Sequence, residues 1–224
     1  MPTTRQPFNE NKAWDKLPAS QKSYSVSLLH FFHFRRQRIA ACWRQEEMLT
    51  WELYQCLRVL PRQLFLQPLL ELIAHLSPVR DEVPMRLIQD LGRLTVTNSP
   101  SLHLQGNKRN SCSDIGIDSP DGTALWLEAK VARLSPASLL TQLQTQQSAL
   151  AAIARPAPGR VVALLPAFQA RPEWPTITWS HILDIITVCR TGLGKLDPDT
   201  FGGLSLLADE LAGRISEHPL QLVR

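Results

Sequence analysis

The sequence has few of the features that mark secreted, zinc-binding or membrane-spanning proteins. Its 224 residues include only four cysteines (Cys42, Cys56, Cys112 and Cys189), which are scattered without the spacing of metal ligands. We therefore expect them to be buried or free thiols in a reducing cytoplasm. No run of residues is long and apolar enough to span a membrane. Residues 1–21 are polar and lack the apolar core of a signal peptide, so we expect a cytoplasmic protein without a membrane partner.

Internal repeats are also missing, and the glutamine-rich stretch at 142–147 is too short to be a low-complexity domain. A chain of this length, with 44% hydrophobic residues, is long enough for one substantial α/β domain with its own core. We predict an N-terminal arm and basic, aromatic helix over 1–44. The predicted α/β core covers 45–190, and a helical extension covers 191–224.

The expected elements follow from hydrophobic periodicity and from helix-terminating residues. Helices are predicted over 22–43, 46–60, 62–76, 85–91, 136–154, 178–190 and 200–216. Strands are predicted over 93–97 and 102–105, in two segments around residues 114 and 128, and over the fully apolar segment 160–165, which is expected to be central in the sheet.

The charge of the chain is modestly basic, with a net charge of +4 and an isoelectric point of about 9.1. This balance favours a polyanionic partner, because phosphate contacts dominate nucleic-acid affinity. The aromatic residues of the N-terminal helix are best explained as a packed helix face, whereas some cations are candidate DNA contacts. The candidate nucleic-acid-binding residues are Arg35, Arg36, Arg38, Lys108 and Arg109.

The most informative residues are three charged side chains within two apolar segments in the middle of the chain. Asp114 has the apolar neighbours Ile115 and Ile117 after it, and a turn at 119–122 leads to a second apolar segment that contains Glu128 and Lys130. Two residues apart on a strand, Glu128 and Lys130 point to the same face. Charges within apolar strands cost free energy unless they are paired or bind a metal, so these residues are candidates for a functional site.

These residue types suit a particular chemistry. Two carboxylates on neighbouring strands can hold a hard divalent cation, Mg²⁺ or equally Mn²⁺, through oxygen ligands. A lysine beside them can steady a phosphate or orient an attacking water, while the cation offsets the charge of the transition state. Asp114, Glu128 and Lys130 thus provide the minimum set for metal-dependent phosphodiester hydrolysis. The simpler interpretation is an ordinary hairpin with an exposed aspartate and a Glu–Lys pair.

Over roughly residues 45–190, the chain resembles the PD-(D/E)XK nuclease superfamily. The resemblance rests on Asp114, Glu128 and Lys130 and on the order of the elements around them. The resemblance implies that the two acids bind the metal and that the lysine assists the attack. It also implies a restriction-endonuclease-like αβββαβ core, in which helices flank a mixed sheet, with extra N-terminal helices here. Ser113 stands where the superfamily usually has proline before the first acid.

A glutamine pair follows the Glu-x-Lys segment on the predicted helix over 136–154. Many RecB-like members of the superfamily have glutamine and, four residues later, tyrosine in this helix. Gln142 matches the first position, and Gln146 stands at the second, so the motif is half matched. Gln146 falls within the apolar face of the helix, with Gln142 at its edge. The pair is either a polar helix flank or a group that contacts substrate or metal-bound water.

An acid on an early helix often completes such sites, and Glu46 is the candidate here. Glu46 shares a helix face with Leu49 and Leu53, whereas Glu47 shares one with Trp51 and Tyr54. The Glu-x-x-Leu-Thr sequence resembles the entry to the first core helix of several superfamily members. Acids are also favoured at helix N-termini by the helix dipole alone, and Glu47 is the alternative site residue.

These expectations combine into a functional hypothesis, namely a Mg²⁺-dependent endonuclease that cleaves DNA. Without a recognisable DNA-reading module, little sequence specificity is expected. A small nuclease of this kind suits an effector in a bacterial or phage-defence assembly, acting with a protein partner or as a homo-oligomer. The alternatives are a catalytically silent nuclease-fold subunit that serves as an interaction module and, more weakly, a nucleic-acid-binding module without chemistry.

Overall fold

We describe the protein from a computed structural model. The structure describes residues 45–77, 82–98, 101–102, 111–131, 135–152, 158–166, 173–196 and 198–217. The chain divides into two compact units, residues 1–43 and residues 44–224, and the first unit lies outside the described residues. The predicted N-terminal helix and the candidate DNA-contacting residues Arg35, Arg36, Arg38, Lys108 and Arg109 also lie outside them.

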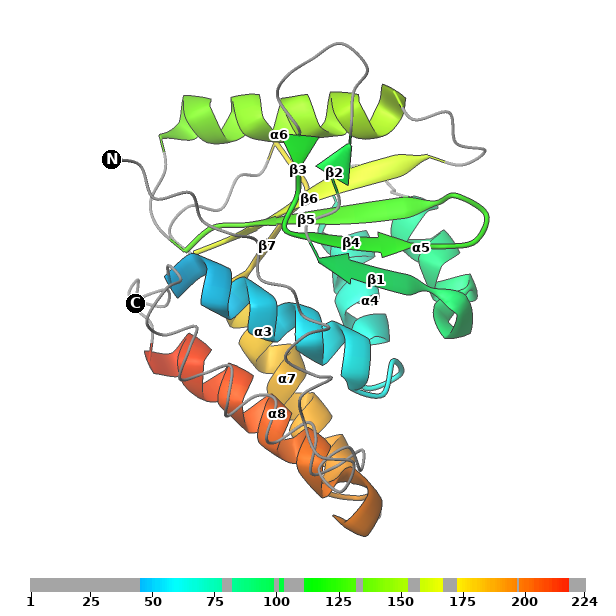
Figure 1. Cartoon of the computed structure of the whole chain (residues 1–224), viewed down its shortest axis with the longest axis vertical. Coiled ribbons are helices and arrows are strands. Elements are labelled where there is room, and N and C mark those ends of the chain that lie inside the picture. Colours follow the sequence, from blue (N-terminus) through cyan, green and yellow to red (C-terminus); the bar gives the residue numbers. More distant parts are fainter. Residues whose placement is uncertain are drawn as a thin grey trace, which may run out of the picture. The chain divides into compact units, whose positions relative to one another are not determined.

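A five-stranded mixed sheet forms the centre of the second unit, with the strand order β1-β4-β5-β6-β7 (Figure 1). Its strands are β1 (Thr95–Asn98), β4 (Ile115–Asp118), β5 (Ala124–Ala129), β6 (Gly159–Leu165) and β7 (Thr176–Thr178). The first three pair antiparallel, and β6 and β7 continue parallel to β5. The expected α/β class with a mixed sheet is therefore confirmed. Two short strands, β2 (Ser101–Leu102) and β3 (Ser111–Cys112), pair separately.

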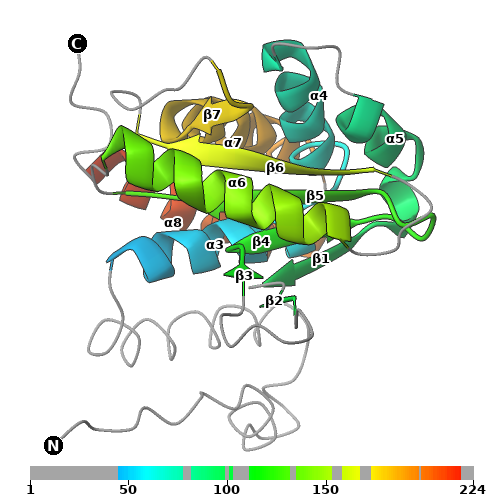
Figure 2. The same ribbon diagram turned by 90° about the horizontal axis from the view of Figure 1, so that it is seen from above.

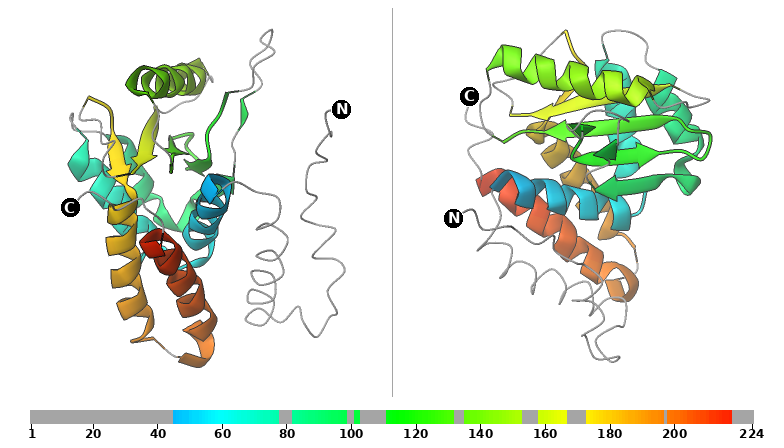
Figure 3. Two further views of the ribbon diagram at one scale, coloured as in Figure 1. Left: turned by 90° about the vertical axis from the view of Figure 1, so that its left-hand side faces the viewer. Right: turned by 45° about the horizontal axis from the view of Figure 1, so that its top comes forward.

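Helices cover both faces of this sheet (Figures 1 and 3). The helices are α3 (Gln45–Val59), α4 (Leu66–Leu76), α5 (Glu82–Gln89), α6 (Pro136–Ala152), α7 (Trp179–Leu193) and α8 (Pro198–Glu217). Helix α6 lies along one face, across β5 and β6 (Figure 2), while α3, α4 and α7 lie on the opposite side, and α8 packs against α3 and α7. None of the helices within the described ranges is both long and apolar enough to cross a membrane.

The apolar strands explain why the core forms where it does. Every residue of β5 is buried, and β6 is buried from Val161 onward, as expected for strands covered on both faces. On the α6 face, Trp126 and Val161 pack against leucines of the helix, among them Leu139 and Leu143. The apolar strand predicted to be central is an inner strand of the sheet, although the middle position belongs to β5.

Three helices have boundaries that differ most from those predicted, and one of them, α7, extends to Leu193 rather than to residue 190. Helix α4 begins at Leu66 rather than at residue 62, because residues 61–65 form a turn closed by hydrogen bonds to the carbonyl of Pro61. Arg62 is used there as a bridge, and its guanidinium donates to the carbonyls of Leu91 and Leu94 at 2.6 and 2.8 Å. Helix α5 begins and ends a few residues before its predicted limits, and a short 3₁₀ helix follows it.

Strand β7 was not predicted, because three residues are too few to show an alternating pattern. It pairs with the end of β6, and its last residue, Thr178, also caps α7. The Thr178 hydroxyl accepts a hydrogen bond from the His181 N–H, and the His181 ring accepts one from the Thr178 N–H. The predicted start of this helix at residues 178–179 is thus confirmed, with a capping arrangement that fixes it.

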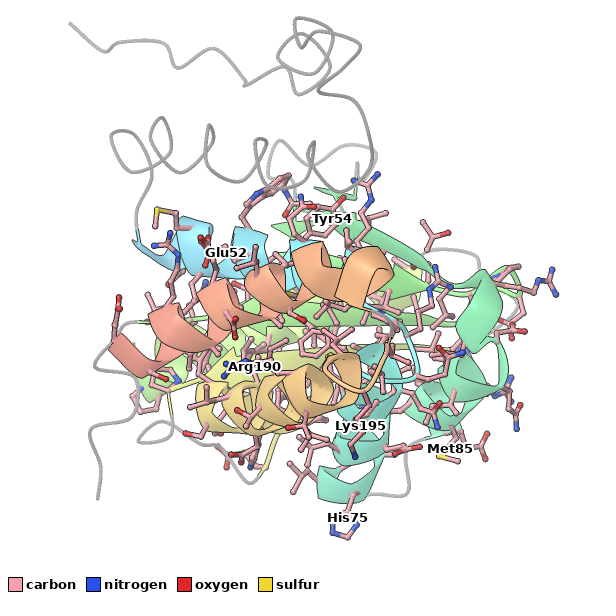
Figure 4. All side chains as sticks on the ribbon, turned by 90° about the horizontal axis from the view of Figure 1, so that it is seen from below. Glu52, Tyr54, His75, Met85, Arg190 and Lys195 are labelled. Atoms are coloured by element: carbon pink, nitrogen blue, oxygen red, sulfur yellow. The ribbon has the colours of Figure 1, made fainter. Side chains whose placement is uncertain are left out.

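Two ion pairs tie α8 to α3 and α7. One residue of each pair, Glu52 and Arg190, is labelled in Figure 4. Arg214 pairs with Glu52 of α3, and these side chains are 21% and 10% exposed. Arg190 of α7 pairs with Asp209, and both of those are nearly half exposed. Buried Cys56 lies in the same region and donates to a carbonyl of α8. Burial raises the pKa of Cys56 well above its usual range, with a further contribution from Glu52, so the thiol stays protonated.

We predict that the two ion pairs contribute unequally to stability. Arg214→Met should lower the free energy of unfolding by about 3 kcal/mol, because it leaves Glu52 as a buried charge without its guanidinium. Arg190→Met removes the exposed pair and should cost less than about 1 kcal/mol. Urea denaturation of both variants measures the difference. Equal losses would show that the Arg214 pair is no better shielded from solvent than the Arg190 pair.

Candidate functional site

The antiparallel pairing of β4 and β5 brings the two predicted acids together. Ile115 pairs with Leu127, so Asp114 lies one step further, opposite Glu128. Asp114 precedes the first residue of β4, yet its N–H still donates to the Leu127 carbonyl at 3.1 Å. Its Oδ2 accepts a hydrogen bond of 2.7 Å from the N–H of Ala129. Opposite residues of an antiparallel pair present their side chains to one face, so the two carboxylates are neighbours.

A tight turn fixes this register. Gly122 has a φ of 92°, which a residue with a side chain rarely adopts. The Asp121 carboxylate accepts hydrogen bonds from the Thr123 N–H at 2.8 Å and from its hydroxyl at 3.0 Å. The Ser119 N–H donates to the Thr123 carbonyl at 2.9 Å and closes the loop. The Pro-Asp-Gly signal in the sequence therefore sets which residue of β5 lies opposite Asp114.

Glu128 is the most buried of the charged site residues, at 2% exposure. It points from β5 toward α6, where two glutamines one helical turn apart meet it. Gln142 Nε2 donates to Glu128 Oε1 at 2.5 Å, and Gln146 Nε2 donates to Oε2 at 2.6 Å. Lys130 Nζ also lies 2.7 Å from Oε1. The cost of burying this carboxylate is therefore offset by hydrogen bonds to both of its oxygens and by an ion pair.

Lys130 follows the last residue of β5, and neighbouring elements hold its backbone on both sides. Its N–H donates to the Leu164 carbonyl of β6 at 2.8 Å, and its carbonyl accepts from the indole N–H of Trp179 at 2.9 Å. Its side chain is 12% exposed, and Nζ lies between Glu128 and Glu46, 3.3 Å from Glu46 Oε1. The ammonium is thus shared between carboxylates from two different elements.

Glu46 enters the site from the first turn of α3. In addition to the ion pair with Lys130, its second oxygen accepts a hydrogen bond from the N–H of Val131 at 3.3 Å. Glu46 therefore contacts the chain at the exit of β5, on the side of Lys130. The side chain of Glu47, the alternative to Glu46, lies outside the described residues.

The crowding of acids changes how the site titrates. Burial, and after it the negative charge of Glu128, raises the pKa of Asp114 from 3.8 to about 7, although Lys130 and the Ala129 N–H act in the opposite direction. For Lys130, burial acts to lower the pKa, but Glu128, Asp114 and Glu46 together outweigh it and raise the value. The site thus holds more negative charge than its own lysine neutralises, and the lysine is an ammonium at neutral pH.

The donor set fits a small hard cation. Among the residues that the structure describes, no group of three or more histidine, cysteine or acidic side chains is placed to hold a metal ion. Mg²⁺ does not need such a group, since it keeps several waters and commonly takes one or two carboxylates. Asp114 and Glu128 provide two, and a cation bound between them would offset both causes that raise the pKa of Asp114, its burial and the negative charge of Glu128.

Five of the residues predicted to form the site lie together around the end of β5. They are Glu46, Asp114, Glu128, Lys130 and Gln142. Gln146, left open between a structural and a functional role, is 2% exposed and contacts Glu128 directly. Its sequence signal was a polar residue within an apolar helix face. Trp179 was missed as a partner of Lys130, because no local pattern links residues that far apart in the chain.

The pKa of Asp114 predicts that this site costs stability at neutral pH. The folded value of about 7 exceeds the unfolded value of 3.8, so folding favours the protonated form. The stabilisation from that proton is complete below about pH 4 and is lost as the pH rises through about 7. Asp114→Asn keeps an acceptor for the Ala129 N–H without the charge. It should unfold at higher urea concentration than the wild type at about pH 8, by about 2 to 4 kcal/mol.

The difference between the two proteins should shrink toward zero at about pH 4, and EDTA should be present throughout. Asp184→Asn, at an exposed carboxylate of α7, is the control and should behave as the wild type. Equal stability of Asp114→Asn and the wild type at the higher pH would mean that Asp114 ionises in the folded protein without cost.

In comparisons with known proteins, the chain matches no protein-family model, no curated protein and no solved structure. What the site can do chemically follows from its own side chains. Asp114 and Glu128 offer oxygen ligands on adjacent strands, Lys130 offers a positive charge beside them, and two amides of α6 hold Glu128 in place. Among the described residues, this cluster is the candidate functional site.

Proposed function

We propose that the chain is a metal-dependent nuclease that hydrolyses phosphodiester bonds of DNA. The observation that supports this proposal most directly is the cluster of the buried Glu128 with the half-buried Asp114 and Lys130 at the end of β5. An ordinary surface hairpin would leave such side chains in water, whereas Glu128 is 2% exposed here. Buried charge in excess of its partners is typical of binding and catalytic sites, because it would cost stability for no structural gain.

The order of the elements gives separate support. Helix α3, strands β1, β4 and β5, helix α6 and strand β6 occur in this order along the chain, with α4 and α5 inserted before β1 and the short β2 and β3 inserted after it, and β6 lies parallel to β5. This order resembles the αβββαβ core of the PD-(D/E)XK nucleases, and Asp114, Glu128 and Lys130 lie in or directly beside the corresponding strands. We therefore propose a restriction-endonuclease-like fold for this unit. Because one fold serves several functions, the argument for activity depends on the side chains.

Each residue receives a role from its contacts. Asp114 and Glu128 would hold the cation, Mg²⁺ or Mn²⁺, through their carboxylate oxygens. The bound cation supplies Lewis acidity toward the phosphate and toward the attacking water. Lys130, whose pKa is raised, is an ammonium, so we assign it to stabilising negative charge on the phosphate and not to taking a proton. Gln142 fixes the orientation of Glu128, and Glu46 holds Lys130 from the other side.

The partner and the setting are proposals of the same kind. A net charge of +4 and an isoelectric point of about 9.1 suit a polyanionic substrate. We propose that the nuclease works as an effector in a bacterial or phage-defence assembly, with a protein partner or as a homo-oligomer. The competing proposal is a silent subunit with a nuclease-like fold. The buried excess charge favours the nuclease, because a subunit without chemistry would gain nothing from keeping it.

We predict that the purified full chain cleaves supercoiled plasmid or single-stranded DNA with Mg²⁺ or Mn²⁺ and not with EDTA. Glu128→Gln should reduce cleavage to the level seen with EDTA, because it removes a charged ligand. Lys130→Met should slow cleavage by about 10²- to 10³-fold, a typical loss when one charge-stabilising group is removed. Lys130→Arg should keep more activity than Lys130→Met if the lysine acts through its charge, and equally little if it acts as a base.

Two controls accompany this assay. Asp184→Asn changes a carboxylate on the exposed side of α7 and should cleave as the wild type does. Circular dichroism should show that each site variant remains folded. Intact DNA in every condition, from a wild-type chain shown to bind the metal, would favour the silent subunit. Cleavage that survives Glu128→Gln would place the chemistry elsewhere.

A further inference from the structure

Three donors meet at the Glu128 carboxylate, and they differ in kind. Gln142 and Gln146 are neutral amides, at 2.5 Å from Oε1 and 2.6 Å from Oε2. Lys130 is charged, and its Nζ shares Oε1 with Gln142 at 2.7 Å. One oxygen thus accepts from both an amide and an ammonium, while the other accepts from an amide. The amides and the ammonium differ in whether they can stay in place when a cation binds to the same carboxylate.

The amides are held in place by the core. Both come from α6, four residues apart on one face, and Gln146 is 2% exposed. Leucines around them pack against the sheet: Leu139 precedes the pair, Leu143 lies between the two glutamines and Leu150 follows them. Moving α6 away from Glu128 would require repacking of this cluster, and closely packed cores resist such displacement. The helix that carries both amides is therefore fixed, and the buried Gln146 has the least freedom to turn away from Glu128.

The ammonium, in contrast, has a second position available. Lys130 Nζ lies 3.3 Å from Glu46 Oε1, so it can move to Glu46 and remain in an ion pair. Its backbone is anchored to Leu164 and Trp179, and its long aliphatic stem can change rotamer without moving the strand. A divalent cation at Asp114 and Glu128 would repel the ammonium, because like charges at a few ångströms in a poorly solvated site repel strongly.

We infer that Lys130 is the internal counter-ion of this site, which a divalent cation displaces from Glu128 toward Glu46, while Gln142 and Gln146 keep the carboxylate in position. Gln146 thereby becomes a positioning residue that acts through Glu128. This inference rests on the metal binding contained in the proposed function. It also explains why a site with three acids, one of them buried, needs a lysine before any metal arrives: without it, Glu128 would be a buried charge with only neutral partners.

The inference predicts effects of opposite sign on metal affinity. Lys130→Met removes a competitor, so Mg²⁺ should bind about tenfold more tightly than to the wild type. Gln146→Leu removes an orienting donor, so Mg²⁺ should bind about 10- to 100-fold more weakly. A lysine and a glutamine that merely stabilised the fold would move affinity in the same direction, because both losses would loosen the site.

Isothermal titration calorimetry of the full chain with MgCl₂ alone measures these affinities. The pH should be about 9, because Lys130 helps to lower the pKa of Asp114, and its loss would otherwise let a proton compete with the metal. Gln147→Leu is the matched control. Gln147 is on the same helix but bonds to the backbone of Gly159 and Val161 in β6, so its loss weakens α6 packing and should leave affinity within about twofold.

Weaker or unchanged binding by Lys130→Met would overturn the inference, as would unchanged binding by Gln146→Leu or no Mg²⁺ binding by any variant. If Gln146→Leu does not fold, Gln142→Leu should weaken binding in the same way, because it removes the amide at the other oxygen. Lys130→Gln, which keeps a polar side chain without the charge, should tighten binding as Lys130→Met does.

The readout separates this inference from the nuclease proposal, since no DNA is present. The predicted order of affinities, combined with intact plasmid in the cleavage assay, would support the counter-ion role and argue against nuclease activity. Metal-dependent cleavage combined with weaker Mg²⁺ binding by Lys130→Met would leave the nuclease proposal standing and remove the counter-ion role.

Discussion

The burial of one carboxylate, Glu128, is the constraint on which the rest of the site depends. A carboxylate almost without contact with water must be compensated within the protein, or its burial would cost more than the fold can supply. Its partners come from three places: the α6 amides, Lys130 just after β5, and, through Lys130, Glu46 of α3. The burial of Glu128 thus requires amide donors from α6 on one face of the sheet and, through Lys130, a carboxylate from α3 on the other.

The topology of the sheet brings the partners of Glu128 to one place. Because β5 and β6 are parallel, the chain must cross between them, and α6 is that connection, laid across the face to which Glu128 points (Figure 2). The antiparallel β4–β5 hairpin brings Asp114 to the opposite position on the neighbouring strand. On the other side, α8 supports α3 through the Arg214–Glu52 pair. The C-terminal helix therefore stabilises the element that carries Glu46, six residues from Glu52.

Much of this arrangement was visible in the sequence, for identifiable reasons. The helices and strands with strong periodicity appear where expected, and the alternation around Glu128 predicted correctly that it shares a face with Lys130. Errors occurred where local signals were weak. Strand β7 is three residues long, α4 starts late because residues 61–65 form a turn closed on the Pro61 carbonyl, and the direct contact of Gln146 with Glu128 was left undecided. For β7 and for Gln146, a partner distant in sequence decides the structure.

The sequence by itself determined the class of the fold, the hairpin that places Asp114 beside Glu128, and the residue types available for chemistry. These follow from periodicity and turn propensity, which act over a few neighbouring residues. Only the tertiary structure decided that both oxygens of Glu128 are held by α6, that Lys130 is shared with Glu46, and that Asp114 has a raised pKa. The burial of a site residue and the charge around it depend on every element that folding brings to that place. Neither can therefore be predicted from one local segment of the sequence.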